Sequence, residues 1–215
     1  MARADRTGRR KNRTEAAKRV PKLGYYFIVT DAAETEVNYL NGLKKSLPAR
    51  LEGRIVIKVS KAKVHEPLAS CKEAAALHPQ YAERWIVFDR DQVPGFDKII
   101  QQADIEGVNV GWSNPCIEVW FNAYFGKMNA CIDSVTCCRN FSVLFEKITG
   151  QEYIKSSSQI YELLSRNGDE VTAINIAERR LQGHLIDGKN IPSEMFPCTT
   201  LHRLVDEIRR KTIGR

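Results

Sequence analysis

Several features of membrane and secreted proteins are missing from this sequence. No apolar run approaches the ~20 residues that a transmembrane helix needs. The N-terminal region also lacks the apolar core of a signal peptide. We therefore expect a cytoplasmic protein with no membrane partner. With 215 residues, of which 43% are hydrophobic and 27% charged, the chain has the composition of an ordinary globular protein.

The sequence also lacks the motifs of several catalytic and metal-binding classes. It contains no G-x-x-x-x-G-K-S/T and no G-x-G-x-x-G after a strand, which argues against nucleotide binding through a glycine-rich loop. There is no G-x-S-x-G, and the four histidines are too scattered to indicate a Cys-His pair. The six cysteines include no C-x-x-C pair and have no histidines at zinc spacing. In a cytosolic chain we expect buried, reduced thiols.

Basic charge is concentrated at one end of the chain. The net charge of +7 arises from residues 1–22, which hold nine basic and two acidic residues, whereas the rest of the chain is balanced. We expect this segment to be a flexible arm with nucleic acid as its partner, because basic side chains bind phosphates and release counterions. A solvated tail without a partner is an equal alternative. The candidate nucleic-acid contacts are Arg9, Arg10, Lys11 and Arg13.

The region after the arm alternates between strand and helix patterns. Strands are expected at residues 24–30, 54–60, 85–89 and 107–112. The intervening helices are expected at residues 34–47, 66–77 and 95–105. This alternation predicts an α/β fold, with a parallel sheet and helices on both of its faces.

From Ser113 onward the sequence predicts helices. Asn114-Pro115 is interpreted as an N-cap followed by the first helical residue. We expect Trp120, in the helix that follows, to be a core residue that joins the sheet to the later helices. Those later helices are expected at residues 135–149, 158–166, 170–181 and 200–211. The predicted regions are an arm (1–22), an α/β domain (23–126) and a helical C-terminal subdomain (127–215).

Acidic and polar side chains follow three of the predicted strands. They are Asp31, Glu34 and Glu36 after the first strand, Asp89 and Asp91 after the third, and Ser113, Asn114 and Glu118 after the fourth. With the strand order 2-1-3-4, these groups meet at the carboxyl edge of the sheet, where such folds bind ligands. Carboxylate oxygens suit Mg²⁺ or Mn²⁺ and a phosphate ester substrate. Two alternatives stay open. In the first, Asp89 and Asp91 belong to a solvated turn without a metal. In the second, Glu118 has no catalytic role and is favoured only because the N-terminus of its helix is positive.

The same residues resemble a known family. The motifs are Phe27-Ile28-Val29-Thr30-Asp31-x-x-Glu34-Thr35-Glu36, Phe88-Asp89-Arg90-Asp91, Ser113-Asn114-Pro115-Cys116-x-Glu118-x-Trp120 and Thr199-Thr200-Leu201-His202. In this order and spacing they resemble the RloB-like family of bacterial defence proteins. That family is similar to the Toprim group, whose nucleases and topoisomerases use a glutamate after strand 1 and Asp-x-Asp after strand 3, with magnesium. The resemblance implies a Toprim-like sheet and a partner ATPase of the SMC-like or AAA kind.

One departure from the Toprim pattern concerns the end of the first strand. Toprim proteins have Glu-Gly where this chain has Asp31-Ala32. Aspartate is one methylene shorter than glutamate, and alanine lacks the freedom of glycine at positive φ. Either the site is retuned, or Glu34 or Glu36 takes the place of the glutamate.

The resulting hypothesis is a metal-dependent nuclease that cleaves DNA or RNA, tRNA included, as an effector of antiviral defence and abortive infection. The expected ligands of Mg²⁺ or Mn²⁺ are Asp31, Asp89 and Asp91. The other expected catalytic residues are Glu34 or Glu36 as general base or acid, and Glu118, with Ser113 and Asn114 orienting the ligands through hydrogen bonds. The alternative is a catalytically degenerate Toprim-like module that regulates or binds another protein. Assembly into a homo-oligomer is left open.

Overall fold

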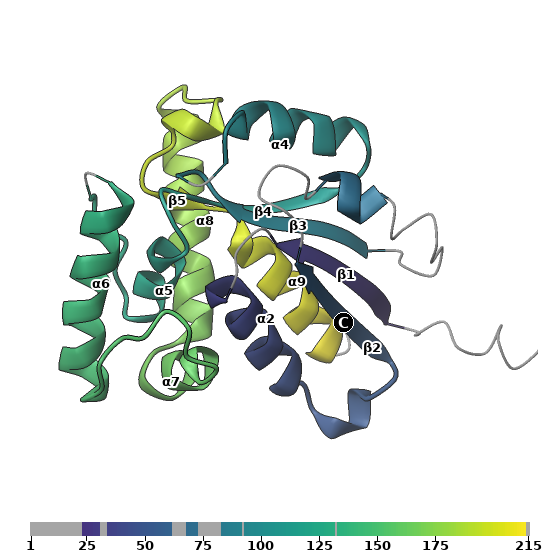
Figure 1. Ribbon diagram of the computed structural model, residues 1–215, viewed down its shortest axis with the longest axis horizontal. Helices are drawn as coiled ribbons and strands as arrows, with labels where there is room; N and C mark the ends of the chain where they lie inside the picture. The colour runs from purple at the N-terminus through teal and green to yellow at the C-terminus, as the bar shows by residue number, and fades with distance from the viewer. Residues whose placement is uncertain are drawn as a thin grey trace, which may run out of the picture.

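A central sheet flanked by helices organises the protein (Figure 1). The structure is a computed structural model, and it describes residues 23–30, 34–61, 68–72, 83–91, 93–131 and 133–213. None of the helices within these ranges has the length and apolar content that crossing a bilayer requires.

The sheet has five strands in the order β2-β1-β3-β4-β5. The strands are β1 (Gly24–Thr30), β2 (Ile55–Lys61), β3 (Glu83–Asp89), β4 (Asn109–Asn114) and β5 (Cys198–Thr199). The first four run parallel, which confirms the predicted α/β class and the order 2-1-3-4. The fifth strand was not predicted, because its two residues are too few to show a pattern. It pairs antiparallel with the end of β4, as Ser113 aligns with Thr199.

The two central strands are buried on both faces. In β1, Tyr26 and Ile28 belong to one hydrophobic cluster, whereas Phe27 and Val29 belong to another on the opposite face. Neighbouring side chains of a strand point to opposite faces, so both kinds of position must be apolar when helices cover both sides. This explains the unbroken apolar runs in the sequence.

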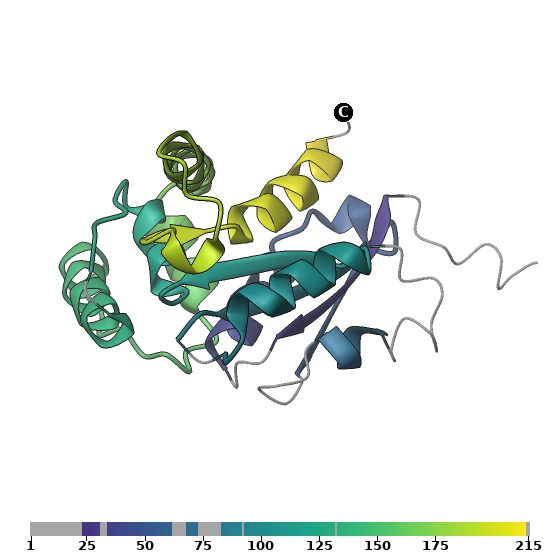
Figure 2. The same cartoon turned by 90° about the horizontal axis from the view of Figure 1, so that it is seen from above.

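Different helices cover the two faces of the sheet. The helices α2 (Thr35–Lys45) and α9 (Leu201–Ile213) pack on one face, and α4 (Phe96–Ile105) packs on the other (Figure 1). Seen from above, α4 lies in front of the sheet (Figure 2). Residues 68–72 are also helical, and Cys71 packs on the same side as α4. The remainder of the helix predicted at 66–77 lies outside the described residues.

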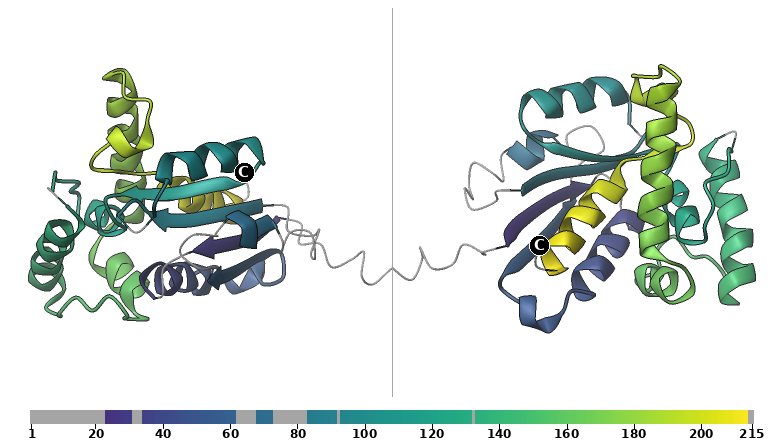
Figure 3. Two further views of the ribbon diagram at one scale, coloured as in Figure 1. Left: turned by 45° about the horizontal axis from the view of Figure 1, so that its top comes forward. Right: turned by 180° about the vertical axis from the view of Figure 1, so that it is seen from behind.

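The other helices lie beyond one end of the sheet (Figure 3). They are α5 (Glu118–Tyr124), α6 (Ser134–Thr149), α7 (Ile160–Asn167) and α8 (Glu170–Ile186). Two short 3-10 helices are also present, η1 (Ala49–Leu51) between α2 and β2 and η2 (Pro192–Glu194) between α8 and β5. The end predicted for α8 at residue 181 is wrong, because the helix continues through Gly183. Trp120 is fully buried in the cluster that contains residues of β1, α5 and α9, which confirms it as a core residue.

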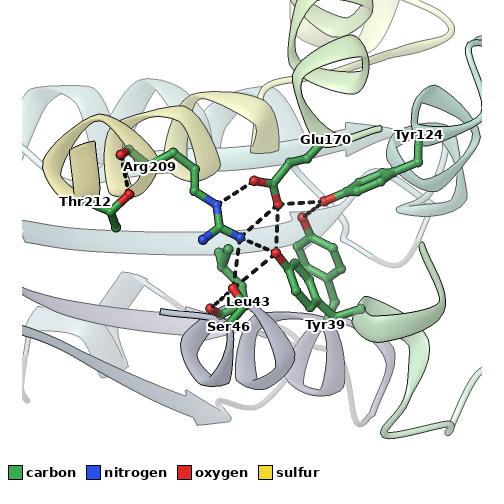
Figure 4. A network of polar contacts seen from close by, with 8 residues as sticks. Tyr39, Leu43, Ser46, Tyr124, Glu170, Arg209 and Thr212 are labelled. Atoms are coloured by element: carbon green, nitrogen blue, oxygen red, sulfur yellow. Dashed lines mark hydrogen bonds and ion pairs between the residues drawn. The ribbon is translucent and has the colours of Figure 1, made fainter. Parts of the chain in front are cut away.

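A polar network around Glu170 connects α8 to four other helices (Figure 4). The Glu170 carboxylate accepts hydrogen bonds from the hydroxyls of Tyr124 (3.1 Å) and Tyr161 (2.9 Å), and it pairs with Arg209 of α9. The Tyr124 hydroxyl also lies 2.8 Å from that of Tyr39 in α2. The C-terminal helices are therefore fixed to the sheet through its covering helices, and the division at residue 126 stays a prediction.

Candidate functional site

The site begins at Asp89, the last residue of β3. Its side chain is 8% exposed and lies at the carboxyl edge of the sheet, beside Ser113 of β4. One carboxylate oxygen, Oδ2, accepts a hydrogen bond from the backbone N–H of Ile117 at 3.0 Å. Because Ile117 immediately precedes α5, this bond holds Asp89 against the beginning of that helix.

Two further buried carboxylates lie at the starts of helices. Glu36 is in the first turn of α2 and Glu118 is the first residue of α5; they are 4% and 1% exposed. The N-termini of helices favour negative charge through the helix dipole. Because α2 follows β1 and α5 follows β4 in the chain, both glutamates come to the same edge of the sheet as Asp89.

The charges of Glu36 and Glu118 both act on the carboxyl group of Asp89. Burial raises the pKa of Asp89 well above its ordinary value, and the charges of Glu36 and Glu118 raise it further. The hydrogen bond from Ile117 lowers the pKa but does not compensate, and the charge of Asp91 adds a smaller increase. A buried carboxylate among like charges is costly to ionise unless a cation is present.

Glu118 has two partners from a loop that precedes α7. The hydroxyl of Tyr153 donates a hydrogen bond to Glu118 Oε1 at 3.0 Å, and Lys155 Nζ lies 3.4 Å from the same oxygen. The other oxygen, Oε2, is buried without a hydrogen-bond partner within the described ranges. Burial lowers the pKa of Lys155, but the charge of Glu118, the hydrogen bond to it and the nearby thiols of Cys138 and Cys116 together outweigh this effect, and the net pKa is raised.

The loop that carries Lys155 is attached to α2. The hydroxyl of Thr35 donates to the backbone carbonyl of Lys155 at 3.1 Å, and the amide of Asn38 donates to that of Ser156 at 2.9 Å. Sequence reasoning missed Tyr153 and Lys155. They lie about 35 residues beyond Glu118 in a segment without a motif, and only the folded chain brings them to the site.

Comparison with known proteins identifies the family. The family described as RloB-like protein matches residues 26–208. The chain belongs to the RloB-like family. No curated protein and no solved structure gives a match. The matched range includes the three buried carboxylates and also Tyr153 and Lys155, so the loop before α7 is part of the RloB-like region.

The remaining predicted site residues of this RloB-like chain differ in their exposure and in their hydrogen-bond partners. Glu34, which precedes α2, and Asp91, which follows β3, are both exposed. The hydroxyl of Ser113 lies 3.2 Å from that of Thr199 in β5. Asp91 therefore lies near the buried carboxylates only as a more distant charge.

Asn114 is not the N-cap that the sequence suggested. It is the last residue of β4, and α5 begins four residues later, at Glu118. Its amide donates to the backbone carbonyls of Pro192 (3.1 Å), Ser193 (3.2 Å) and Met195 (2.9 Å). Asn114 thus holds the segment around η2 against the sheet, because a buried amide needs partners for its N–H groups.

Some predicted residues of this RloB-like protein lie outside the described residues. They are Asp31 and the arm residues Arg9, Arg10, Lys11 and Arg13. The convergence of Asp31 with Asp89 and Asp91 around a metal ion, and the contact of the arm with nucleic acid, stay predictions.

The described part of the site has the chemistry of a hard-cation site, but it does not form a complete set of ligands. Within the described ranges, no three His, Cys, Asp or Glu side chains are grouped closely enough to hold a metal ion. The donors present are carboxylate oxygens, which Mg²⁺ and Mn²⁺ prefer. The buried, unpartnered Oε2 of Glu118 and the raised pKa of Asp89 both indicate negative charge that a cation would compensate. The described residues therefore fit part of the ligand set of a divalent ion, and the predicted ligand Asp31 lies outside the described residues.

The six cysteines agree with the sequence prediction. All are free thiols, and all except Cys138, which is partly exposed, are buried.

Proposed function

We propose that this RloB-like protein is a divalent-metal-dependent nuclease that hydrolyses phosphodiester bonds. The observation that carries the proposal is the group of three buried carboxylates, Glu36, Asp89 and Glu118, at the carboxyl edge of a parallel sheet. Structural carboxylates are rarely buried together without cations, because their repulsion destabilises the fold. Such a cost is typical of functional sites, where pKa values are perturbed.

The carboxylates have different roles in this proposal. Asp89 would hold Mg²⁺ or Mn²⁺ together with Asp31 and Asp91, and its bond to the N–H of Ile117 fixes the carboxylate in one orientation. Glu36, which is buried in the first turn of α2 at the same edge of the sheet, would accept the proton of the attacking water. When bound, the ion supplies Lewis-acid chemistry and lowers the pKa of water, which phosphodiester hydrolysis requires near neutral pH.

The biological setting is proposed from the RloB-like family alone. In this proposal the protein is a cytoplasmic effector of antiviral defence that acts through abortive infection, together with a partner ATPase of the SMC-like or AAA kind. The substrate is DNA or RNA, with tRNA as one candidate. The arm at residues 1–22 supplies positive charge for binding this substrate.

A cleavage assay with matched variants tests the proposal. The purified protein is incubated with mixed tRNA and with plasmid, with and without Mg²⁺ or Mn²⁺. We expect metal-dependent cleavage that Asp89→Asn abolishes. The control is Asp104→Asn, the same isosteric change at an exposed position near the end of α4, which should cut at the wild-type rate.

The competing function is a regulatory or protein-interaction module. It is favoured by Asp31-Ala32 in place of Glu-Gly and by the lack of a complete metal-ligand group in the described ranges. If the wild type cuts neither substrate with either metal and its melting temperature ignores both ions, the nuclease proposal is wrong and the module is supported.

A further inference from the structure

The pair formed by Lys155 and Glu118 joins an accessible cation to a buried anion. The Lys155 side chain is 60% exposed, whereas that of Glu118 is 1% exposed, and the two are 3.4 Å apart. An ion pair on the surface contributes little to stability because water screens both charges. Here water screens only the lysine, so the carboxylate depends on this ammonium and on the hydroxyl of Tyr153 for its compensation.

The position of Lys155 is set by α2 and not by its own loop alone. Hydrogen bonds from Thr35 and Asn38 fix the backbone at residues 155 and 156. The same helix carries Glu36 in its first turn. One helix therefore carries Glu36 and also fixes the backbone of Lys155, the cation that faces Glu118, which is a more constrained arrangement than a lysine on a free loop.

Negative charge exceeds positive charge in the described site. When they are ionised, Glu36, Asp89 and Glu118 together carry three negative charges, and Asp91 adds a more distant one. Lys155 supplies one positive charge next to Glu118, so a divalent ion would be needed for the remaining carboxylates. The exposed part of the ammonium also leaves N–H donors that face solvent, where a substrate phosphate would approach.

We propose that Lys155 is a resident cation of the acidic site, which compensates Glu118 in place of a second metal ion and contacts an oxygen of the substrate phosphate. This role rests on the proposed nuclease function. The contact is electrostatic, since the three N–H donors of an ammonium suit phosphate oxygens without a fixed geometry.

Metal binding and stability test the first part of this role. Without Lys155, a divalent ion is no longer repelled by the ammonium and Glu118 needs another cation. Calorimetric titration should therefore show Mn²⁺ binding to Lys155→Met about tenfold more tightly than to the wild type. Lys155→Arg keeps the charge and should bind as the wild type does. In EDTA, Lys155→Met should melt at a lower temperature than the wild type, and Mn²⁺ should remove most of that difference.

A matched control separates this effect from the loss of any ion pair. Lys72→Met removes a lysine of similar exposure, 53%, from a 3.0 Å pair with Glu106 that lies outside the site. It should leave Mn²⁺ affinity unchanged. Equal affinities for Lys155→Met and the wild type would overturn the resident-cation role, and so would weaker binding by Lys155→Met.

Nucleic-acid binding tests the second part. If Lys155 contacts a phosphate, the slope of log affinity against log salt should fall by about one in Lys155→Met and not in Lys72→Met. An unchanged slope would overturn the phosphate contact. Neither measurement requires cleavage. A wild type that binds metal and nucleic acid as described but does not cut would therefore overturn the nuclease function and leave the role of Lys155 standing.

Discussion

The raised pKa of Asp89 predicts how stability depends on pH when no metal is present. A carboxyl group whose pKa is raised in the folded state binds its proton more tightly there than in the unfolded chain. Its contribution to stability is complete below the ordinary aspartate pKa of about 3.9 and is lost as the pH rises through the folded pKa. In EDTA, the free energy of unfolding of the wild type should therefore be reduced by this group above about pH 4.

The magnitude follows from proton linkage. When the folded and unfolded states differ by one bound proton, the free energy of unfolding changes by at most about 1.4 kcal/mol per pH unit. For a chain of 215 residues this corresponds to about 3–5 °C in melting temperature per pH unit. Asp89→Asn removes the titration but retains an oxygen that accepts from Ile117, so the variant should be more stable than the wild type in EDTA at neutral pH.

Calorimetric melting across a pH series, in EDTA and then in Mg²⁺, measures the effect. The difference in melting temperature between Asp89→Asn and the wild type should grow as the pH rises from about 4, the region of the ordinary aspartate pKa. In Mg²⁺ at a hundredfold excess over its Kd, the wild type should gain about 2.7 kcal/mol and Asp89→Asn much less. Parallel pH profiles for the two proteins, matching that of Asp104→Asn, would refute the reasoning that repulsion at Asp89 destabilises the metal-free fold.

Three further predictions concern packing and the arm. Trp120→Ala should lower the free energy of unfolding by about 3–5 kcal/mol in denaturant titration, because the indole is fully buried; normal stability with weaker nucleic-acid binding would instead indicate a stacking role. Gly42→Ala should cost about 1–3 kcal/mol in the same titration, since the added Cβ would lie 2.3 Å from Cβ of Tyr161 where α2 meets α7; an unchanged midpoint would show that α7 can move away. Deleting residues 1–19 should leave the melting temperature within about 2 °C and flatten the salt dependence of nucleic-acid binding; a large drop in melting temperature would contradict the prediction of a dispensable arm.

Sequence patterns were sufficient for the central sheet because its signals are local. The apolar run before Asp89 predicted a buried strand, and the alternation of strands and helices predicted parallel pairing. The order 2-1-3-4 followed from one requirement, that the first and third strands are neighbours so that the acidic groups after them can share a metal ion. Predictions failed where the signal was short or ambiguous. β5 has only two residues. The pair Asn114-Pro115 is compatible both with the end of a strand and with the start of a helix, so the sequence did not distinguish the two.

The sequence by itself therefore determined the α/β class, the strand order, the edge of the sheet at which acidic side chains gather, and the RloB-like family to which the chain belongs. Only the tertiary structure decided which of those acids are buried together, and it selected Glu36 and Glu118 beside Asp89 while leaving Glu34 and Asp91 exposed. It also brought Lys155 to the site. The physical reason is that periodicity and turn chemistry act over a few residues, whereas burial and charge compensation depend on segments that are distant in the chain and meet only when the helices pack on the sheet.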